Sequence, residues 1–295
     1  MNKKIVLAGG TGFIGTYFAG RFAAQGYEVK IISRRPGHIA WSDLAGIKEA
    51  LEGAELLLNL AGKSVDCRYH SRNKEAIRTS RTETTRLLGE LLLTCGNPPP
   101  LWLNSSTATI YRHAEDRPMT EEHGEIGTGF SVDVALAWEG AFFSFSLPKT
   151  RQAALRIAIV LGKDGGVMRP FRNLVAFGLG GALGPGKQMF SWVHIEDVYR
   201  IVMYIKDHQE LEGVFNCAAP HPIPNREFMH QLRRAMNKRI GLPSPSWLLE
   251  AGAVIIRTET ELILKSRWVI PERLQRHGFV FRYNRIEDAL QDICT

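Results

Sequence analysis

Three glycines, Gly9, Gly12 and Gly15, form the pattern that points most directly to chemistry in this sequence. They follow the short apolar run Lys4–Ala8, and residues with helical spacing begin at Gly12. In a strand–turn–helix unit, Gly9 permits the tight turn, Gly12 lets a pyrophosphate approach the backbone, and Gly15 lets the helix pack closely on the strand. Free N–H groups at the start of the helix bind the phosphates. The pattern predicts a dinucleotide-binding loop, and the alternative is a glycine-rich tight turn without a ligand.

The second apolar run, Glu28–Ser33, is followed by two arginines, Arg34 and Arg35. A site that prefers NAD usually has an acidic residue at this place, which accepts a hydrogen bond from the ribose 2′-hydroxyl. The hydroxyl of Ser33 and the two guanidinium groups suit a 2′-phosphate dianion instead. We therefore expect NADP(H) as the cofactor, with a solvated basic turn as the alternative.

The order of the predicted elements indicates how these residues are positioned. Short apolar runs alternate with segments of helical spacing over residues 1–162, including one long helix over 71–95. This alternation predicts an α/β fold with a Rossmann-type, doubly wound parallel sheet. Glycine-rich loops and two helical segments, 225–237 and 246–256, follow. We expect an NAD(P)-binding domain over 1–162 and a smaller C-terminal α/β lobe on the substrate side over 163–295, with the chain partly interleaved between them.

Charge and cysteine content argue against several other classes of protein. The net charge is +7, and residues 225–285, with 12 basic and 5 acidic side chains, hold all of the excess. A solvated surface explains this segment, with attraction of an anionic substrate as the alternative; without a nucleic-acid motif, no nucleic-acid partner is expected. The four scattered cysteines predict neither a metal site nor disulfides, and they suit a cytoplasmic protein. No apolar run approaches the ~18 residues that span a membrane, so no membrane partner is expected.

Further segments match one family in the same order along almost the whole chain. They are Asn59–Gly62, Ser80–Thr85, Ser105–Tyr111, Trp138–Glu139, Arg156–Gly162, Ser191–Asp197 and Ser266–Leu274. With them, the sequence resembles the short-chain dehydrogenase/reductase superfamily, in its extended and atypical NAD(P)-dependent epimerase/dehydratase branch. Within that branch it is most similar to a group of epimerase family proteins that has a human member. The resemblance implies a nicotinamide cofactor and oxidoreductase or epimerase chemistry.

The resemblance also implies which residues bind the cofactor. The glycine-rich loop would hold the pyrophosphate, Ser33 and Arg34 the 2′-phosphate, and Leu60 and Ala61 the adenosine side. Two arginines match basic family positions near the cofactor. The expected cofactor-binding residues are Gly9, Thr11, Gly12, Phe13, Ile14, Gly15, Ser33, Arg34, Arg35, Leu60, Ala61, Gly62, Arg81 and Arg156.

The chain departs from the family at the catalytic pair. In this superfamily, a tyrosine transfers the proton while hydride moves, and a lysine four residues later lowers the pKa of that tyrosine. None of the seven tyrosines of this chain has a lysine at that spacing. Aligned on Glu139, Ser131 takes the place of the tyrosine and Ala135 the place of the lysine. The usual acid–base pair is therefore absent.

Two catalytic candidates remain, Thr107 and Tyr111. Their segment resembles a strand end of extended family members, in which Thr107 aligns with the hydroxyl residue that binds substrate. Such a segment lies at the carboxyl edge of the sheet, where ligands bind in open α/β folds. Tyr111 is a substitute for the missing acid, or else its ring packs beneath the cofactor. Ser131 is a weaker candidate, because an unaided hydroxyl is a poor proton donor.

His194 and Asp197 are expected to have structural roles. Asp197 precedes an apolar helical pattern and would interact with the N-terminus of that helix. His194 is expected to be hydrogen-bonded and partly buried, with substrate contact as the alternative. The glycine-rich segments 162–172 and 177–187 resemble the family's loops that close over substrate.

Two functions remain open. The first is an NADP(H)-binding oxidoreductase or epimerase that acts by hydride transfer on an unknown small polar substrate, with a homodimer as one option for its assembly. The second is an NADP(H)-binding sensor or regulatory protein with little or no turnover. The absent tyrosine–lysine pair favours the second function, whereas the family resemblance favours the first.

Overall fold

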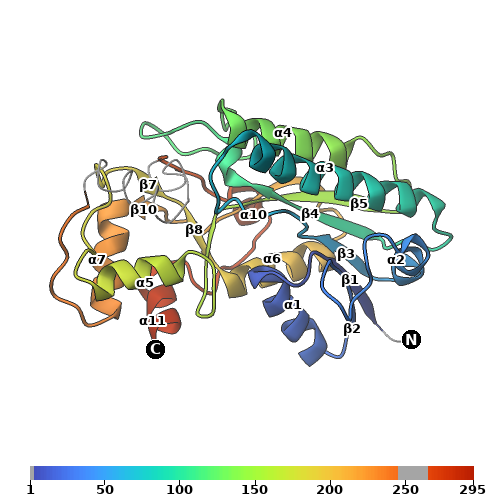
Figure 1. Cartoon of the computed structure of the whole chain (residues 1–295), viewed down its shortest axis with the longest axis horizontal. Helices are drawn as coiled ribbons and strands as arrows, with labels where there is room; N and C mark the ends of the chain where they lie inside the picture. The colour runs from blue at the N-terminus through green and yellow to red at the C-terminus, as the bar shows by residue number, and fades with distance from the viewer. Residues whose placement is uncertain (1–2, 245–264) are drawn as a thin grey trace.

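The computed structural model describes residues 3–244 and 265–295 (Figure 1). The helix expected over residues 246–256 lies outside the described residues. Within the described residues, no helix combines the length and the apolar character needed to cross a membrane.

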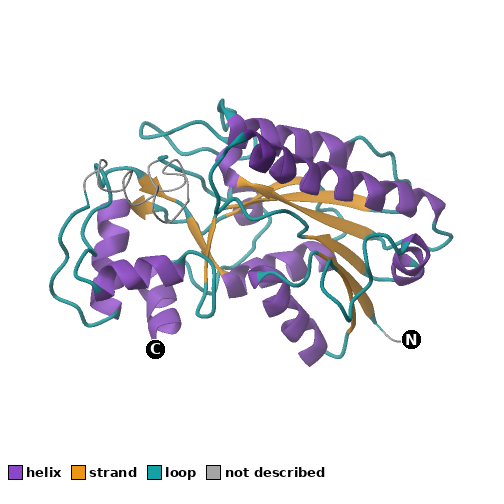
Figure 2. Cartoon of the chain, in the orientation of Figure 1, coloured by secondary structure: helices purple, strands orange, loops and turns teal. Residues whose placement is uncertain are grey.

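A six-stranded sheet forms the centre of the larger part of the molecule (Figure 2). Its strands are β1 (Lys4–Ala8), β2 (Glu28–Ile32), β3 (Leu56–Asn59), β4 (Leu101–Thr107), β5 (Arg151–Ile157) and β9 (Gly213–Cys217). The order is β2-β1-β3-β4-β5-β9, and every neighbouring pair is parallel. The direction of the strand order reverses between β1 and β3, which is the point where ligands bind in such sheets. The predicted Rossmann-type fold is confirmed.

Helices cover both faces of this sheet because its central strands are apolar on both sides. Ile5 and Leu7 of β1 face one layer, and Val6 and Ala8, the alternate residues, face the other. The first layer consists of α1 (Phe13–Ala24) and α6 (Ile195–Asp207), and the second of α2 (Leu44–Leu51), α3 (Ser71–Thr94) and α4 (Phe130–Phe143). Figure 1 shows α3 and α4 above the sheet and α1 and α6 below it.

A smaller lobe lies beyond the carboxyl end of β5, at the left of Figure 1, around a separate apolar cluster. Its elements are β6 (Ile159–Leu161), α5 (Met168–Ala176), β7 (Met189–Phe190), β8 (Trp192–His194), β10 (Ile223–Pro224), α7 (Asn225–Ala235) and α11 (Ile286–Cys294), while α10 (Glu272–Arg276) lies against β9. The sheet strand β9 follows part of this lobe in sequence, so the chain passes from the sheet to the lobe and back. The division of the chain at residue 162 stays a prediction.

Several arginines of the basic segment 225–285 are used in packing. Arg233 of α7 donates a hydrogen bond to the carbonyl of Gly180, and Arg273 of α10 donates to the carbonyl of Val214 at 2.6 Å. Each guanidinium group thus connects two segments that are distant in sequence. These bonds fix the positions of the two charges, which the neutral carbonyl groups do not cancel.

His194 and Asp197 connect α6 to the C-terminal part of the chain. The Asp197 side chain is fully buried and accepts hydrogen bonds from the backbone N–H groups of Arg282 and Tyr283, both at 2.8 Å. His194, also buried, caps α6, and its Nε2 atom lies 3.3 Å from Asp292 of α11. His194 is buried and hydrogen-bonded, as expected, whereas the Asp197 carboxylate, in the first turn of α6, binds backbone N–H groups of the C-terminal segment instead of those of its own helix.

We predict that Asp197→Asn lowers the free energy of unfolding by about 2 kcal/mol, because one of the two accepting oxygens becomes an NH2 group that faces a backbone N–H donor. Urea denaturation measures the loss. In the matched variant Asp207→Asn, which changes a 61% exposed carboxylate at the other end of α6, the change should stay within about 0.5 kcal/mol. Equal losses in the two variants would contradict the role assigned to Asp197.

Candidate functional site

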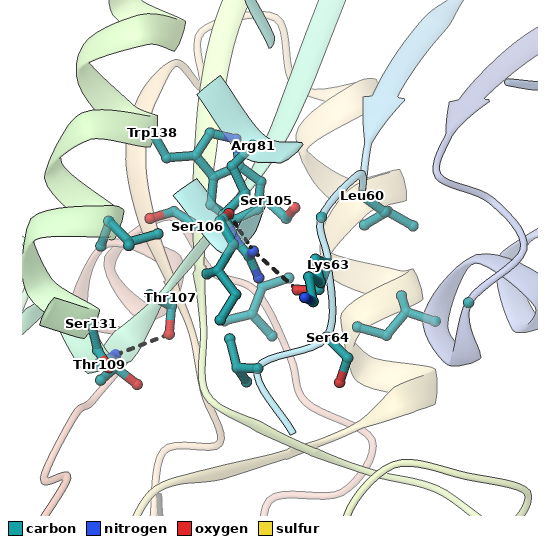
Figure 3. A pocket seen from close by; sticks show the side chains of 18 of the residues that line it. Leu60, Lys63, Ser64, Arg81, Ser105, Ser106, Thr107, Thr109, Ser131 and Trp138 are labelled. Carbon is teal, nitrogen blue, oxygen red and sulfur yellow. Dashed lines mark hydrogen bonds between the residues drawn. The ribbon is translucent and has the colours of Figure 1, made fainter. Parts of the chain in front are cut away.

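A cavity of about 490 Å³ lies at the carboxyl ends of β1, β3, β4 and β5 (Figure 3). It is next to the point where the strand order reverses. Nine of the residues predicted from the sequence line it: Gly9, Gly12, Phe13, Ile14, Gly15, Leu60, Gly62, Arg81 and Thr107. Of the other predicted residues, Thr11, Ser33, Arg34, Arg35, Ala61, Tyr111 and Arg156 do not line the cavity.

The glycine-rich loop requires glycine at two positions where another part of the backbone lies very close. Gly9 has a φ of +76°, and a Cβ atom there would lie 2.7 Å from the backbone of Ala61. A Cβ atom on Gly15 would lie 2.6 Å from the backbone of Gly10. A side chain at either position would therefore push α1 away from the end of the sheet.

The start of α1 is open to a ligand. Gly12 is the N-cap of the helix, and no side chain caps the first N–H groups. A Cβ atom on Gly12 would have only one neighbour, the carbonyl oxygen of Gly9 at 4.0 Å. Uncapped N–H groups and the positive end of the helix dipole bind phosphate groups. The loop therefore fits the pyrophosphate of a dinucleotide.

Ser33, Arg34 and Arg35 lie beside this loop, just beyond β2. The N–H of Gly9 donates to the carbonyl of Ile32 at 2.8 Å, which fixes the end of β2 next to the loop. The hydroxyl oxygen of Ser33 accepts from the N–H of Arg35 at 2.8 Å, while both arginine side chains are exposed. The turn thus places two exposed arginines just beyond the strand that neighbours the glycine-rich loop, and guanidinium groups suit a 2′-phosphate.

Arg81 of α3 forms part of the cavity wall. Its Nη1 atom donates to the carbonyls of Lys63 at 3.1 Å and Ile77 at 2.9 Å, and its guanidinium carbon lies 5.1 Å from the centre of the Trp138 ring. Burial lowers the pKa of Arg81 to about 10, and the Tyr69 phenol opposes this shift. No ion pair joins Arg81 to a carboxylate within the described part of the chain. Its positive charge is therefore available to a ligand in the cavity.

A network of buried polar groups lies beneath the cavity. Ser106, which lines the cavity, donates to Glu139 at 2.6 Å, and Arg156 holds the same carboxylate through Nε at 2.9 Å and Nη2 at 2.8 Å. Arg156 also donates to the hydroxyl of Tyr111 at 2.9 Å, and this hydroxyl donates to Asn216 at 2.9 Å. The network connects β4, α4, β5 and β9 below the site.

Tyr111 and Arg156 are thus placed differently from the sequence prediction. Burial raises the pKa of the Tyr111 phenol, an effect that Arg156 opposes. Burial also opposes the charge of Arg156, but hydrogen bonds to Glu139 raise its pKa above the usual value. The geometry supports the packing alternative for Tyr111 instead of the proton donor, and Arg156 contacts Glu139 below the cavity instead of lining it.

The family's tyrosine and lysine positions do face the cavity. Ser131 and Ala135, one turn apart on α4, both line it, as Thr107 does at the end of β4. The helix therefore has the placement expected from the family, but its side chains at these two positions are short. Thr107 is placed as predicted for a residue that binds substrate.

Sequence reasoning missed the loop that follows Gly62. Lys63, Ser64 and Tyr69 of this loop line the cavity. The Lys63 ammonium donates to the side-chain oxygen of Asn73 at 2.6 Å. The position of the loop, directly after a cofactor-binding strand end, is the one sequence signal that could have identified these residues.

Comparisons with known proteins agree on one family. The NAD dependent epimerase/dehydratase family matches residues 5–129, and a domain of unknown function, DUF1731, matches residues 244–293. The human epimerase family protein SDR39U1 is 32% identical over 98% of this chain and 99% of its own length. An epimerase family protein of Staphylococcus epidermidis is 29% identical over 99% of both chains.

A crystal structure of human SDR39U1 with NADPH is also similar to this chain. It superposes with a TM-score of 0.91 at 30% sequence identity and covers 99% of each chain. The similarity therefore extends over both the sheet and the smaller lobe.

We predict that Glu139→Gln lowers the free energy of unfolding by about 3 kcal/mol, because it leaves the buried Arg156 cation without its counter-charge. Urea denaturation measures this loss. The matched variant is Glu122→Gln, whose carboxylate pairs with Arg276 where both side chains are about half exposed. It should cost less than about 1 kcal/mol. A small loss in Glu139→Gln would show that the pair does not hold the floor of the cavity.

Proposed function

This chain belongs to the NAD dependent epimerase/dehydratase family, in the group of SDR39U1 epimerase family proteins, and we propose that it binds NADP(H) and transfers hydride to or from a small polar substrate. The observation that carries the proposal is the uncapped start of α1, which opens into a cavity at the reversal of strand order. The NADPH in the human SDR39U1 structure supports the choice of cofactor.

Each part of the site would hold one part of the cofactor. The glycine-rich loop would bind the pyrophosphate, and Ser33, Arg34 and Arg35 would bind the 2′-phosphate. Leu60, Ala61 and Gly62, at the end of β3, would contact the adenosine side. Bound NADP(H) supplies or accepts a hydride at its nicotinamide ring.

The size of the cavity limits the substrate. Pockets of about 300–1,000 Å³ hold small ligands, and the cavity of about 490 Å³ would have to contain the nicotinamide as well. Hydroxyl groups of Thr107 and Ser131 lie in its wall beside the apolar side chains of Val134 and Ile157. These walls suit a small carbonyl or alcohol that forms one or two hydrogen bonds.

A sensor without turnover is the second candidate function. It is favoured by the short side chains of Ser131 and Ala135, which leave the family's two acid–base positions without a titratable group. Cofactor binding is common to both functions. Only a measurement of hydride transfer separates them.

We predict that Arg34→Ala weakens NADPH binding by about 10- to 100-fold, because a charge-assisted hydrogen bond to the 2′-phosphate is lost. NADH, which lacks this phosphate, should bind the variant and the wild type equally. Isothermal titration calorimetry measures both affinities. Arg86→Ala, which removes an exposed arginine of α3, serves as the control and should leave both unchanged. Wild-type protein that binds NADH as tightly as NADPH would contradict the assignment of NADP(H).

For the catalytic function, we predict oxidation of NADPH with at least one member of a panel of small aldehydes, ketones and sugar-derived ketones. Thr107→Ala should slow this reaction about tenfold or more, because a hydrogen bond to the reacting oxygen is lost. The control is Thr94→Ala at the exposed end of α3. Stopped-flow absorbance of NADPH follows the reaction. No oxidation across the panel by a protein that binds NADPH would favour the sensor.

A further inference from the structure

The two short side chains on α4 leave the cavity without the usual proton donor. Ser131 stands where the family has its tyrosine, and its hydroxyl has a pKa far above neutral. Ala135, where the family has its lysine, carries no charge. A protein that reduces a carbonyl in this cavity therefore needs a proton donor and a cation from other elements.

Tyr69 supplies a phenol near the position where the family has its catalytic tyrosine. It belongs to the loop between β3 and α3, and among the described residues it is the one tyrosine that lines the cavity. Its ring packs edge-on against that of Phe130, with centres 4.9 Å apart and planes at 67°. Because Phe130 directly precedes Ser131, Tyr69 lies near the start of α4, where the family has its tyrosine.

Arg81 supplies a cation near the position where the family has its catalytic lysine. Its guanidinium group lies against the ring of Trp138, which follows Ala135 by three residues and so lies on the same side of α4. A Cβ atom on Gly62 would lie 3.0 Å from the guanidinium carbon, so this glycine leaves room for Arg81 in the wall.

The phenol and the guanidinium group interact electrostatically. The charge of the Tyr69 phenolate raises the pKa of Arg81 against the larger effect of burial. By reciprocity, the Arg81 cation favours the phenolate form of the Tyr69 side chain. The family's lysine has the same effect on its tyrosine.

We propose that Tyr69 is the proton donor of this site and that Arg81 replaces the missing lysine. The inference rests on the proposed hydride transfer to a carbonyl substrate. As the carbonyl carbon receives the hydride, its C=O π bond breaks and its oxygen takes the proton of the Tyr69 hydroxyl. The product is the alcohol, and a proton from solvent water restores the phenol.

Lys63 is the competing proton donor, because the cavity's titratable groups within the described chain are Lys63, Tyr69 and Arg81. Its ammonium is hydrogen-bonded to Asn73 at 2.6 Å, at the start of α3. Figure 3 shows Lys63 on the side of Leu60, across the view from Thr107 and Ser131. Tyr69 packs on Phe130, the residue next to Ser131, whereas the hydrogen bond of Lys63 directs its ammonium to Asn73.

The first test needs no substrate. The ultraviolet difference spectrum of tyrosinate, recorded over a pH titration of the purified protein, should show one tyrosine that ionises below the usual pKa of about 10. This transition should be absent in Tyr69→Phe, should move to higher pH in Arg81→Met, and should return toward the wild-type pH in Arg81→Lys. Tyr69→Phe keeps the ring that packs on Phe130. An unchanged low-pH transition in Tyr69→Phe, or none in the wild type, would overturn the proposal.

The second test uses the fastest carbonyl substrate of the panel in a single turnover with bound NADPH. Tyr69→Phe should slow hydride transfer about 100-fold or more while the NADPH affinity stays unchanged, and the wild-type decrease in rate at high pH should disappear. Tyr27→Phe, which changes a tyrosine outside the cavity, is the matched control. Equal rates for the wild type and Tyr69→Phe, or a loss only in Lys63→Met, would overturn the proposal. No turnover in the wild type would reject the proposed enzyme function, and the tyrosinate titration would then decide whether the pair exists.

Discussion

The close approach of Gly9 to the backbone of Ala61 is the constraint on which the rest of the site depends. It brings the turn after β1 against the end of β3, at the point where the strand order reverses. The uncapped start of α1 then lies over the cavity, and the loop after Gly62 begins beside it. A side chain at Gly9 would separate these elements, so cofactor binding and the shape of the cavity share one backbone contact.

The arginines near the site have different roles, and the groups that surround each arginine determine its role. Arg156 is held by the two oxygens of Glu139, and this pair fixes α4 to β5 beneath the cavity. Arg81 is hydrogen-bonded to carbonyl oxygens, lies against an aromatic ring and forms no ion pair with a carboxylate in the described part of the chain, so its charge is available to the cavity. Arg34, which is exposed beyond β2, suits a charged ligand that remains partly in water. The net charge of the chain does not distinguish these roles.

The features of the site that could be predicted from the sequence are those that depend on local spacing. The glycine-rich loop, the parallel sheet and the basic turn after β2 follow from neighbouring residues, and the sheet was confirmed. Local spacing left two alternatives open for Tyr111, a proton donor or a packed ring, because its partner Asn216 comes from a strand far along the chain. Tyr69 was missed because its loop has no periodic pattern and because Phe130, on which its ring packs, belongs to another element.

The central claim is that one cavity holds the nicotinamide end of the cofactor between the glycine-rich loop and α4, with Tyr69 and Arg81 in its wall. A crystal structure of the complex with NADPH tests this claim most directly. The account predicts the nicotinamide ring inside the cavity, with the Tyr69 hydroxyl and Thr107 on the side where hydride leaves. A nicotinamide ring outside the cavity, or a Tyr69 hydroxyl on the far side of the ring from Thr107, would contradict it.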